Sequence, residues 1–362
     1  MSEEESQEEE KRKEPLHGRW EWLDQFRGLI IIFLIISVIT WPLSGDFSTA
    51  DPWIGPPLLN HGFRYFNEYP ALITIIDIGQ QIFMFVLGLG AYLAFTSRME
   101  KKGTKEAWKH GIIRVAILYG LAFLDDGLIG GLIFSGEIPW KEVLWYGTLA
   151  NLAIGSFAAY LVVYLIPKDA DKRIIVSVGI MIIHAILYTL PIFDRWIFTE
   201  GGVVFPFNAF NHAAIAIAGT SFCQWYKMDP NDPTVGFKKR ILPAATISIV
   251  AFYLFDWVQP AEHHDATTSL ALLAIATSGF LIAVFYGFEK MNFKVPILSE
   301  MGRNLLLLFI LAFVFDQYVQ IFDKTFLVDN PWLTMILIGI VPIAVEAGVA
   351  MLLAKKDIII KI

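Results

Sequence analysis

The chain has 362 residues, of which 56% are apolar and only 17% are charged. A soluble domain of this size needs more polar surface, so the composition excludes a soluble enzyme. Recurring long uncharged stretches indicate instead an all-α, polytopic integral membrane protein in contact with the lipid bilayer. The single cysteine, Cys223, excludes a disulfide framework or a thiolate metal site within one chain. The net charge of −7 gives no reason to expect a nucleic-acid partner.

Much of the negative charge lies at the N-terminus, where seven glutamates occur within the first 14 residues. Such a charged stretch cannot bury apolar surface, so we expect residues 1–18 to form a disordered, acidic cytoplasmic tail. The tail also lacks the apolar run of a secretory signal. No linker divides the remainder, and residues 19–362 are expected to form a single transmembrane domain.

Ten apolar segments follow in chain order, each approaching the ~20 residues needed to cross ~30 Å of hydrocarbon. They are residues 28–42, 71–95, 111–135, 143–166, 174–192, 203–226, 241–258, 266–288, 304–322 and 332–354. The third is interrupted by Asp125 and Asp126 in "FLDDGLIGGLIF", and the sixth opens with the polar sequence "FPFNAFNH". The pattern predicts a bundle of about ten transmembrane helices.

Lysine and arginine are distributed unevenly over the predicted loops. The two terminal segments and alternate loops together hold 22 of them, and the other loops hold four: Arg64, Lys141, Arg195 and Lys324. Cytoplasmic loops of membrane proteins carry an excess of these residues, so we expect both termini to be cytoplasmic. We expect the protein to lie in the plasma membrane.

One group of polar residues is predicted on the cytoplasmic side. Asp24 and Arg27 precede the first span at i, i+3 spacing, so they can pair on one helical face. Arg98, Arg114 and the "GRN" sequence containing Arg303 and Asn304 lie on the same side. Two ordinary interpretations remain open: arginines that reach toward lipid headgroups, and a plain anchor for the first helix.

A second group is predicted on the outer side, where histidine and carboxylates are frequent and lysine is nearly absent. His61 and Arg64 lie in a long first outer loop, and Asp77 lies about two turns into the second span. The other members are Asn208, Asn211, His212, His264 and Asp265, with Asp125, Asp126, Asp256, Glu262, His263 and Asp316 in the same half. Ionisable residues within a membrane are functional candidates, with structural hydrogen bonding as the alternative. The adjacent histidines of "HHD" would diverge on a helix, so we expect no metal site.

Several segments resemble the heparan-alpha-glucosaminide N-acetyltransferase family of membrane acyltransferases. "WLDQFRGLIIIFLI" is similar to the opening of that family, and "LLNHGF", "IIDIGQQIFMFVLGLGAYLAF" and "MGRNLLLLFIL" follow in the family's order. The resemblance implies acetyl transfer from cytoplasmic acetyl-CoA to a sugar on the far side of the membrane. It also implies that His61 is the catalytic histidine, with Asp77 as its polar companion.

The two polar groups suit such a transfer. Arginine pairs well with phosphate, so the inner group is expected to bind acyl-CoA through Asp24, Arg27, Arg114, Arg303 and Asn304. Neutral imidazole can accept the proton of an attacking amine or hydroxyl, which suits the catalytic role that the resemblance implies for His61 and Asp77. The residues expected to bind the sugar or amine acceptor are Arg64, Asn208, Asn211, His212, His264 and Asp265.

Some alternatives stay open at this point. The acyl group can move by direct attack on the thioester or through an acyl-histidine on His61. Intramembrane carboxylates would also serve a proton- or cation-coupled transporter, for which "DDGLIGG" is a candidate broken helix. A third alternative is a non-catalytic membrane scaffold. The sequence does not distinguish a monomer from a homodimer.

Overall fold

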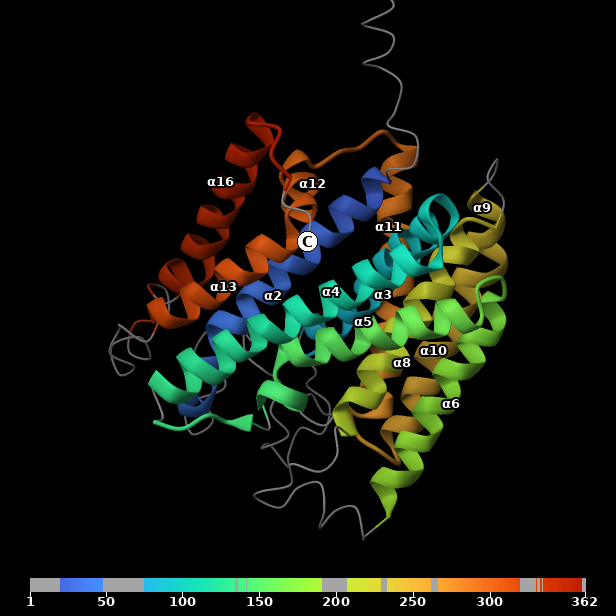
Figure 1. Ribbon diagram of the computed structural model, residues 1–362, viewed down its shortest axis with the longest axis horizontal. Coiled ribbons are helices and arrows are strands. Elements are labelled where there is room, and N and C mark those ends of the chain that lie inside the picture. Colours follow the sequence, from blue (N-terminus) through green and yellow to red (C-terminus); the bar gives the residue numbers. More distant parts are fainter. Residues whose placement is uncertain are drawn as a thin grey trace, which may run out of the picture.

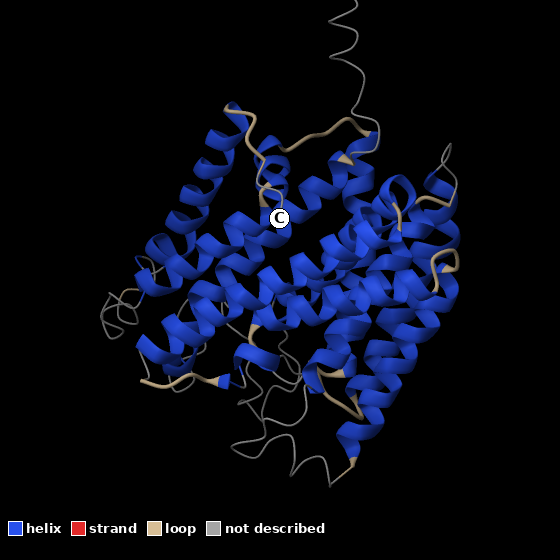
Figure 2. Ribbon diagram, in the orientation of Figure 1, coloured by secondary structure: helices blue, strands red, loops and turns tan. Residues whose placement is uncertain are grey.

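The computed structural model describes residues 20–47, 75–133, 136–140, 142–190, 207–228, 233–261, 266–319, 330, 333 and 335–359. All regular elements within these ranges are helices, and no strand occurs among them (Figure 2). The all-α prediction is therefore confirmed for this part of the chain. The predicted acidic tail lies outside the described residues.

The described helices are arranged as a bundle of long elements (Figure 1). Their bounds are α2 Glu21–Phe47, α3 Ile75–Lys102, α4 Thr104–Ala122, η1 Phe123–Ile133, η2 Glu142–Tyr146, α5 Thr148–Leu165, α6 Ala170–Thr189, α8 Phe207–Tyr226, α9 Pro233–Gly236, η3 Phe237–Ile241, α10 Leu242–Asp256, α11 Thr268–Lys290, α12 Pro296–Arg303, α13 Leu305–Val319, η4 Met335–Ile340 and α16 Val341–Lys355. The elements labelled η are π-helical.

Helical structure is found in each of the ten predicted span regions. Four helical segments of the described chain are long and apolar enough to cross a membrane by length and composition: Asp77–Lys102, Glu142–Leu165, Thr268–Lys290 and Ile336–Lys355. The count of ten spans therefore stays a prediction. In the third region the two aspartates do not break the helix, because α4 continues directly into the wider turns of η1.

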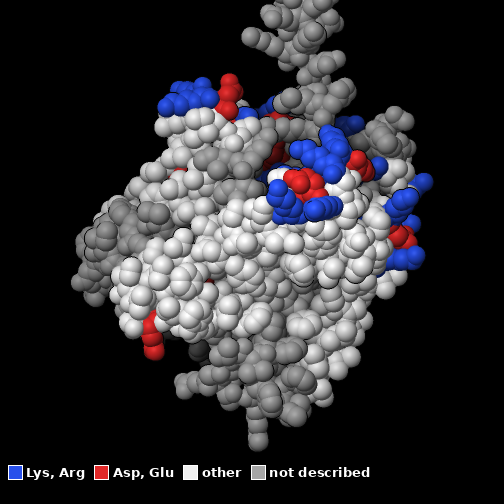
Figure 3. Space-filling view, viewed as in Figure 1, with Lys and Arg blue, Asp and Glu red and all other residues white. Residues whose placement is uncertain are grey.

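Charged side chains are concentrated at one end of the bundle. On the face drawn in Figure 3, the described Lys and Arg side chains gather in the upper part of the view. Helices α3, α11 and α16 all end in lysine, at Lys102, Lys290 and Lys355. This arrangement agrees with the predicted sidedness of the loops, while the assignment of that end to the cytoplasm stays a prediction. We call it the basic end.

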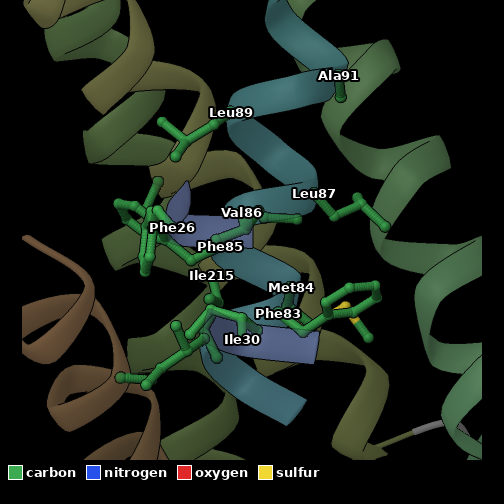
Figure 4. Close-up of a cluster of buried hydrophobic side chains, with 14 of the residues drawn as sticks. Phe26, Ile30, Phe83, Met84, Phe85, Val86, Leu87, Leu89, Ala91 and Ile215 are labelled. Atoms are coloured by element: carbon green, nitrogen blue, oxygen red, sulfur yellow. The ribbon is translucent and has the colours of Figure 1, made fainter. Parts of the chain in front are cut away.

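Helix α3 forms much of the core. The consecutive residues Met84, Phe85 and Val86 are all inaccessible to solvent, so the helix is covered around its circumference at this level. Figure 4 shows their side chains among those of α2 and α8, including Phe26, Ile30 and Ile215. The ring centroids of Phe85 and Phe222 lie 4.9 Å apart in an edge-to-face contact, which ties α3 to α8.

The start of α6 shows two different uses of charge. The Asp169 side chain caps the helix by accepting a hydrogen bond from the Lys172 backbone N–H at 3.0 Å. This bond, together with the Lys172 ammonium group, lowers the pKa of Asp169. Arg173, counted above among the loop cations, is instead fully buried. It donates to the carbonyl oxygens of Ile166 and Thr220 and lies 4.9 Å from the ring centroid of Tyr92, so its role is structural.

Candidate functional site

Two sequence segments that are distant along the chain form one structural unit at the basic end. A Cβ atom on Gly28 of α2 would overlap the carbonyl group of Leu298, and one on Gly302 of α12 would overlap the carbonyl group of Asp24. The helix backbones therefore touch at both points, which only glycine permits. The Val295 N–H also donates to Oε1 of Gln25 at 2.9 Å. These contacts place the "DQFRG" and "GRN" sequences side by side.

The predicted pair of Asp24 and Arg27 is confirmed. Nη1 of Arg27 lies 3.6 Å from Oδ1 of Asp24, and Asp24 is buried. The guanidinium group extends against α3 at Gly90, where a Cβ atom would lie only 2.6 Å from Nη2 of Arg27. A glycine at this position therefore makes room for the arginine between α2 and α3.

Four arginines from four helices line one cavity of 290 Å³. They are Arg27 on α2, Arg98 on α3, Arg114 on α4 and Arg303 on α12, and His110 joins them from α4. The cavity follows α3 from Arg98 to Phe83, which is about 22 Å at 1.5 Å per residue. We call it the arginine cavity. It is long and narrow, and its deeper wall is apolar, with Phe83, Leu87 and Leu305.

The positive charge of the arginine cavity is only partly neutralised by neighbouring carboxylates. Besides the Asp24–Arg27 pair, Arg303 donates to both carboxylate oxygens of Glu300, and Nε2 of His110 lies 3.2 Å from Glu106. Within the described ranges, Arg98 and Arg114 form no ion pair, and the buried Nε of Arg114 has no hydrogen-bond partner. The cavity thus keeps cationic donors for an anion.

The structure therefore brings together Arg27, Arg114 and Arg303 of the predicted cofactor-binding residues. Asp24 supports Arg27, and Asn304 is buried at the junction of α12 and α13 without lining the cavity.

The predicted cofactor-binding residues did not include Arg98, for which contact with lipid headgroups was left open, or His110, to which no role was assigned. Both lie beside the connection at Gly103, which has a φ of 85° and turns α3 directly into α4. A glycine between two helical patterns was the available signal for their proximity.

Four of the predicted outer residues that the structure describes are buried in the helix bundle. Asp77 on α3 and Asn208, Asn211 and His212 on α8 are each at most 4% exposed. Asn211 donates from Nδ2 to the carbonyl oxygen of Ala266 at 2.7 Å, and a longer contact of 3.4 Å joins it to Oγ1 of Thr268. Its amide nitrogen is therefore engaged in holding the chain that leads into α11.

Further hydrogen bonds extend this outer network through residues that the sequence did not single out. The Thr268 hydroxyl donates to the carbonyl oxygen of Met181 and lies 3.3 Å from Nδ1 of His184. The Thr268 N–H donates to Oε1 of the buried Gln259, at 3.1 Å. These hydrogen bonds join α6, α8 and α11, although the buried Oδ1 of Asn211 and Nε2 of Gln259 have no partner among the described residues.

The arginine cavity and the predicted outer residues do not share a surface. Asp77 lies six residues before Phe83 on α3, about 9 Å beyond the deep end of the cavity. None of Asp77, Asn208, Asn211 and His212 lines it. The other predicted residues, His61, Arg64, His264 and Asp265, lie outside the described part of the chain. In the part that is described, no group of three or more His, Cys, Asp or Glu could hold a metal ion.

Comparison with protein families gives a match over most of the chain. A family model described as an acyltransferase domain matches residues 20–351, which is most of the chain and includes the arginine cavity. No curated protein matches the chain significantly.

Proposed function

We propose that this chain uses cytoplasmic acyl-CoA to acylate an acceptor on the other side of the membrane. The premise is that the chain belongs to the acyltransferase domain family and is an integral membrane protein. The acyl group is acetyl, and the acceptor is a sugar or amine at the outer face. The activity is of the heparan-alpha-glucosaminide N-acetyltransferase type that the sequence resembles.

The arginine cavity is the observation that carries this proposal. Coenzyme A combines several phosphate charges with a long flexible arm that ends in the thioester. The cavity offers four arginines, from Arg98 near the basic end to Arg27 at the level of Gly90, and apolar side chains farther along α3. Guanidinium groups form strong, charge-assisted hydrogen bonds with phosphate, so the charged part of the ligand would lie near Arg98 and Arg114. A volume of 290 Å³ suits the arm and the adjoining phosphates better than the whole cofactor.

The reaction needs a base at the far end of the arm. In the direct route, the acceptor amine or hydroxyl attacks the thioester carbonyl carbon while His61 takes its proton. The carbon–sulfur bond then breaks, and CoA leaves as a thiolate that is protonated afterwards. In the alternative route, His61 itself receives the acyl group first and the acceptor then removes it. Asp77 is proposed to orient the imidazole, as carboxylates commonly do for catalytic histidines.

The developing oxyanion needs a hydrogen-bond donor. Asn211 is the weaker candidate because its Nδ2 already donates to the carbonyl oxygen of Ala266. Asn208 and Arg64 are therefore proposed for this role. His212, His264 and Asp265 are proposed to contact the acceptor.

The experiment uses purified protein in liposomes with radiolabelled acetyl-CoA on one side and candidate sugars or amines on the other. We expect label on an acceptor, transfer abolished by His61→Ala with acetyl-CoA binding retained, and little effect of the control His263→Ala. Full turnover by His61→Ala would remove the catalytic assignment. Ion flux without consumption of acetyl-CoA would favour a transporter instead. A cytoplasmic location of the "LLNHGF" loop, shown by tag accessibility in intact cells, would contradict the proposed sidedness.

A further inference from the structure

A second cavity lies between α6 and α10, with α8 and α11 behind it. Its volume is 540 Å³. On α6 it is lined by Ile174, Val178 and Ile182, and on α10 by Ile247, Ala251 and Phe255. Both sets follow i, i+4, i+8 spacing, so each helix presents one continuous apolar stripe to the cavity. The cavity is therefore a groove between two parallel apolar walls, and we call it the lateral groove.

The lateral groove has a charged end. Asp171, Lys239 and Arg240 line it there. The two carboxylate oxygens of Asp171 are engaged separately, one accepting from Nε1 of Trp225 at 2.8 Å and the other lying 3.1 Å from Arg240. Among the described residues, Lys239 has no ion-pair partner, and it is exposed together with the neighbouring Lys238. The end thus carries excess positive charge accessible from solvent.

The depth of the groove corresponds to one leaflet of a bilayer. Along α6 it extends from Asp171 to Ile182, about 16 Å at 1.5 Å per residue, and the hydrocarbon core is about 30 Å thick. The adjacent residues Ile183, Val250 and Leu254, which do not line the groove, are exposed and apolar, as expected for a lipid-facing surface. A groove in this position opens toward lipid rather than toward the arginine cavity.

We propose that the lateral groove binds one anionic phospholipid from the leaflet at the basic end. The phosphate lies against Lys239 and Arg240, and one acyl chain follows the apolar stripes of α6 and α10. Charge complementarity and the one-leaflet depth favour a lipid over a peptide or a second copy of the chain, because a phospholipid has its charge at one end and its apolar chains at the other, as the groove does. The bound lipid connects α10, which packs mainly on α11, to α6. This proposal is independent of the proposed enzyme activity.

The test is native mass spectrometry of the purified full-length protein, mixed in detergent with dioleoyl phosphatidylglycerol or dioleoyl phosphatidylcholine at equal concentrations. We expect one phosphatidylglycerol to remain bound at activation energies that remove phosphatidylcholine, with at least a tenfold difference in the bound fraction. We expect Lys239→Gln/Arg240→Gln to abolish this preference. The matched control is Lys101→Gln/Lys102→Gln, which removes two exposed charges from the same end of the bundle and should retain it. Equal retention of both lipids by the wild type, or an unchanged preference in the groove variant, would overturn the proposal.

A second variant tests the apolar part of the groove independently of charge. Ser248 lines the groove on α10, and Ser248→Phe should fill it and reduce retention of either lipid at least fivefold. Glycerol 3-phosphate, which has the phosphate but no acyl chain, should not displace the lipid at millimolar concentration. Displacement by glycerol 3-phosphate, or normal retention in folded Ser248→Phe, would show that the groove is not the lipid site.

Discussion

The arginine cavity and the outer polar network are both made of polar residues inside an apolar bundle, but they use their hydrogen-bonding capacity differently. In the outer network, the side chains of Asn211, Thr268 and Gln259 bond to backbone groups and to one another. In the arginine cavity, Arg98 and Arg114 have no ion-pair partner among the described residues, although they line a common space. The first arrangement holds helices together, whereas the second leaves donors for a ligand.

The comparison shows that the presence of a polar residue within a membrane segment does not by itself identify its role. A buried group that already has its partners contributes to the structure, because breaking its bonds costs free energy. A cationic group that faces a cavity is only partly neutralised until an anion binds there. The predictions that distinguish the two regions therefore compare the effect of each substitution on the free energy of unfolding with its effect on ligand affinity.

The largest effect is expected at the contact that builds the arginine cavity. Gly302→Ala places a methyl group on the backbone of Asp24, which cannot move aside as a side chain could. We expect a loss of about 3 kcal/mol, at the upper end of the usual range for over-packing, and weaker binding of acetyl-CoA. The measurement is thermal unfolding in detergent, followed by acetyl-CoA titration.

The matched control for Gly302→Ala is Gly179→Ala. Gly179 lies within α6, and a Cβ atom there would meet no atom within 4 Å. This substitution should stabilise the protein by roughly 0.5–1 kcal/mol, because alanine favours a helix more than glycine does. Equal effects at the two positions would show that the close contact of α2 with α12 does not hold the cavity.

Arg27→Ala should weaken acetyl-CoA binding by about 2 kcal/mol, or roughly 30-fold, as expected for a hydrogen bond to a charged group. Acceptor affinity should change little, since the arginine lies at the donor end. Isothermal titration with each ligand measures both effects, and Lys105→Ala on the exposed start of α4 is the control. Equal acetyl-CoA affinity in wild type and Arg27→Ala would exclude Arg27 from the donor site.

Asn211→Ala should affect stability and leave acetyl-CoA affinity unchanged. The substitution removes a buried hydrogen bond to Ala266, for which we expect a loss of about 1 kcal/mol. Asn208 lies on the same helix, and its amide oxygen, like that of Asn211, has no partner among the described residues. Because Asn208 is the residue proposed to act on the reacting groups, Asn208→Ala should raise the KM for the acceptor with a smaller shift in Tm. Loss of acetyl-CoA affinity in Asn211→Ala at an unchanged Tm would contradict the separation of the two regions.

The smallest effect is expected for Gly90→Ala. The new methyl group would lie 2.6 Å from Nη2 of Arg27, and a flexible guanidinium group can shift to avoid it. We expect acetyl-CoA affinity to fall about threefold, equivalent to about 0.7 kcal/mol. Gly287→Ala, where a Cβ atom would meet nothing within 4 Å, is the control and should have no effect on titration. A loss as large as that of Arg27→Ala would mean that Arg27 cannot adapt.

Much of the fold could be predicted because an apolar run long enough to cross a membrane is expected to form a helix. Helical structure occurs in each of the ten predicted regions, and four segments of the described chain are long and apolar enough to cross a membrane. The predicted orientation of the helices also placed Arg27, Arg114 and Arg303 on the same side of the membrane, and in the structure these three side chains line one cavity.

What could not be predicted depends on which helices pack together and which way their side chains point. Nothing in the spacing of Gly28 or Gly302 indicates that α2 and α12 touch there. Arg173 has the sequence context of a loop cation, and its burial is favourable because it donates to the carbonyl groups of Ile166 and Thr220, contacts that the sequence does not indicate. His110 was passed over because its position relative to Arg98 depends on the turn at Gly103.

The most direct test of the arginine cavity is the dissociation constant for acetyl-CoA, measured by equilibrium titration on two double variants. Arg27→Gln/Arg114→Gln removes two charges from the cavity, and Lys239→Gln/Arg240→Gln removes two from the lateral groove. We predict that the first pair weakens acetyl-CoA binding at least 100-fold and that the second leaves it unchanged. Similar affinities in both double variants would show that the arginine cavity is not the donor site.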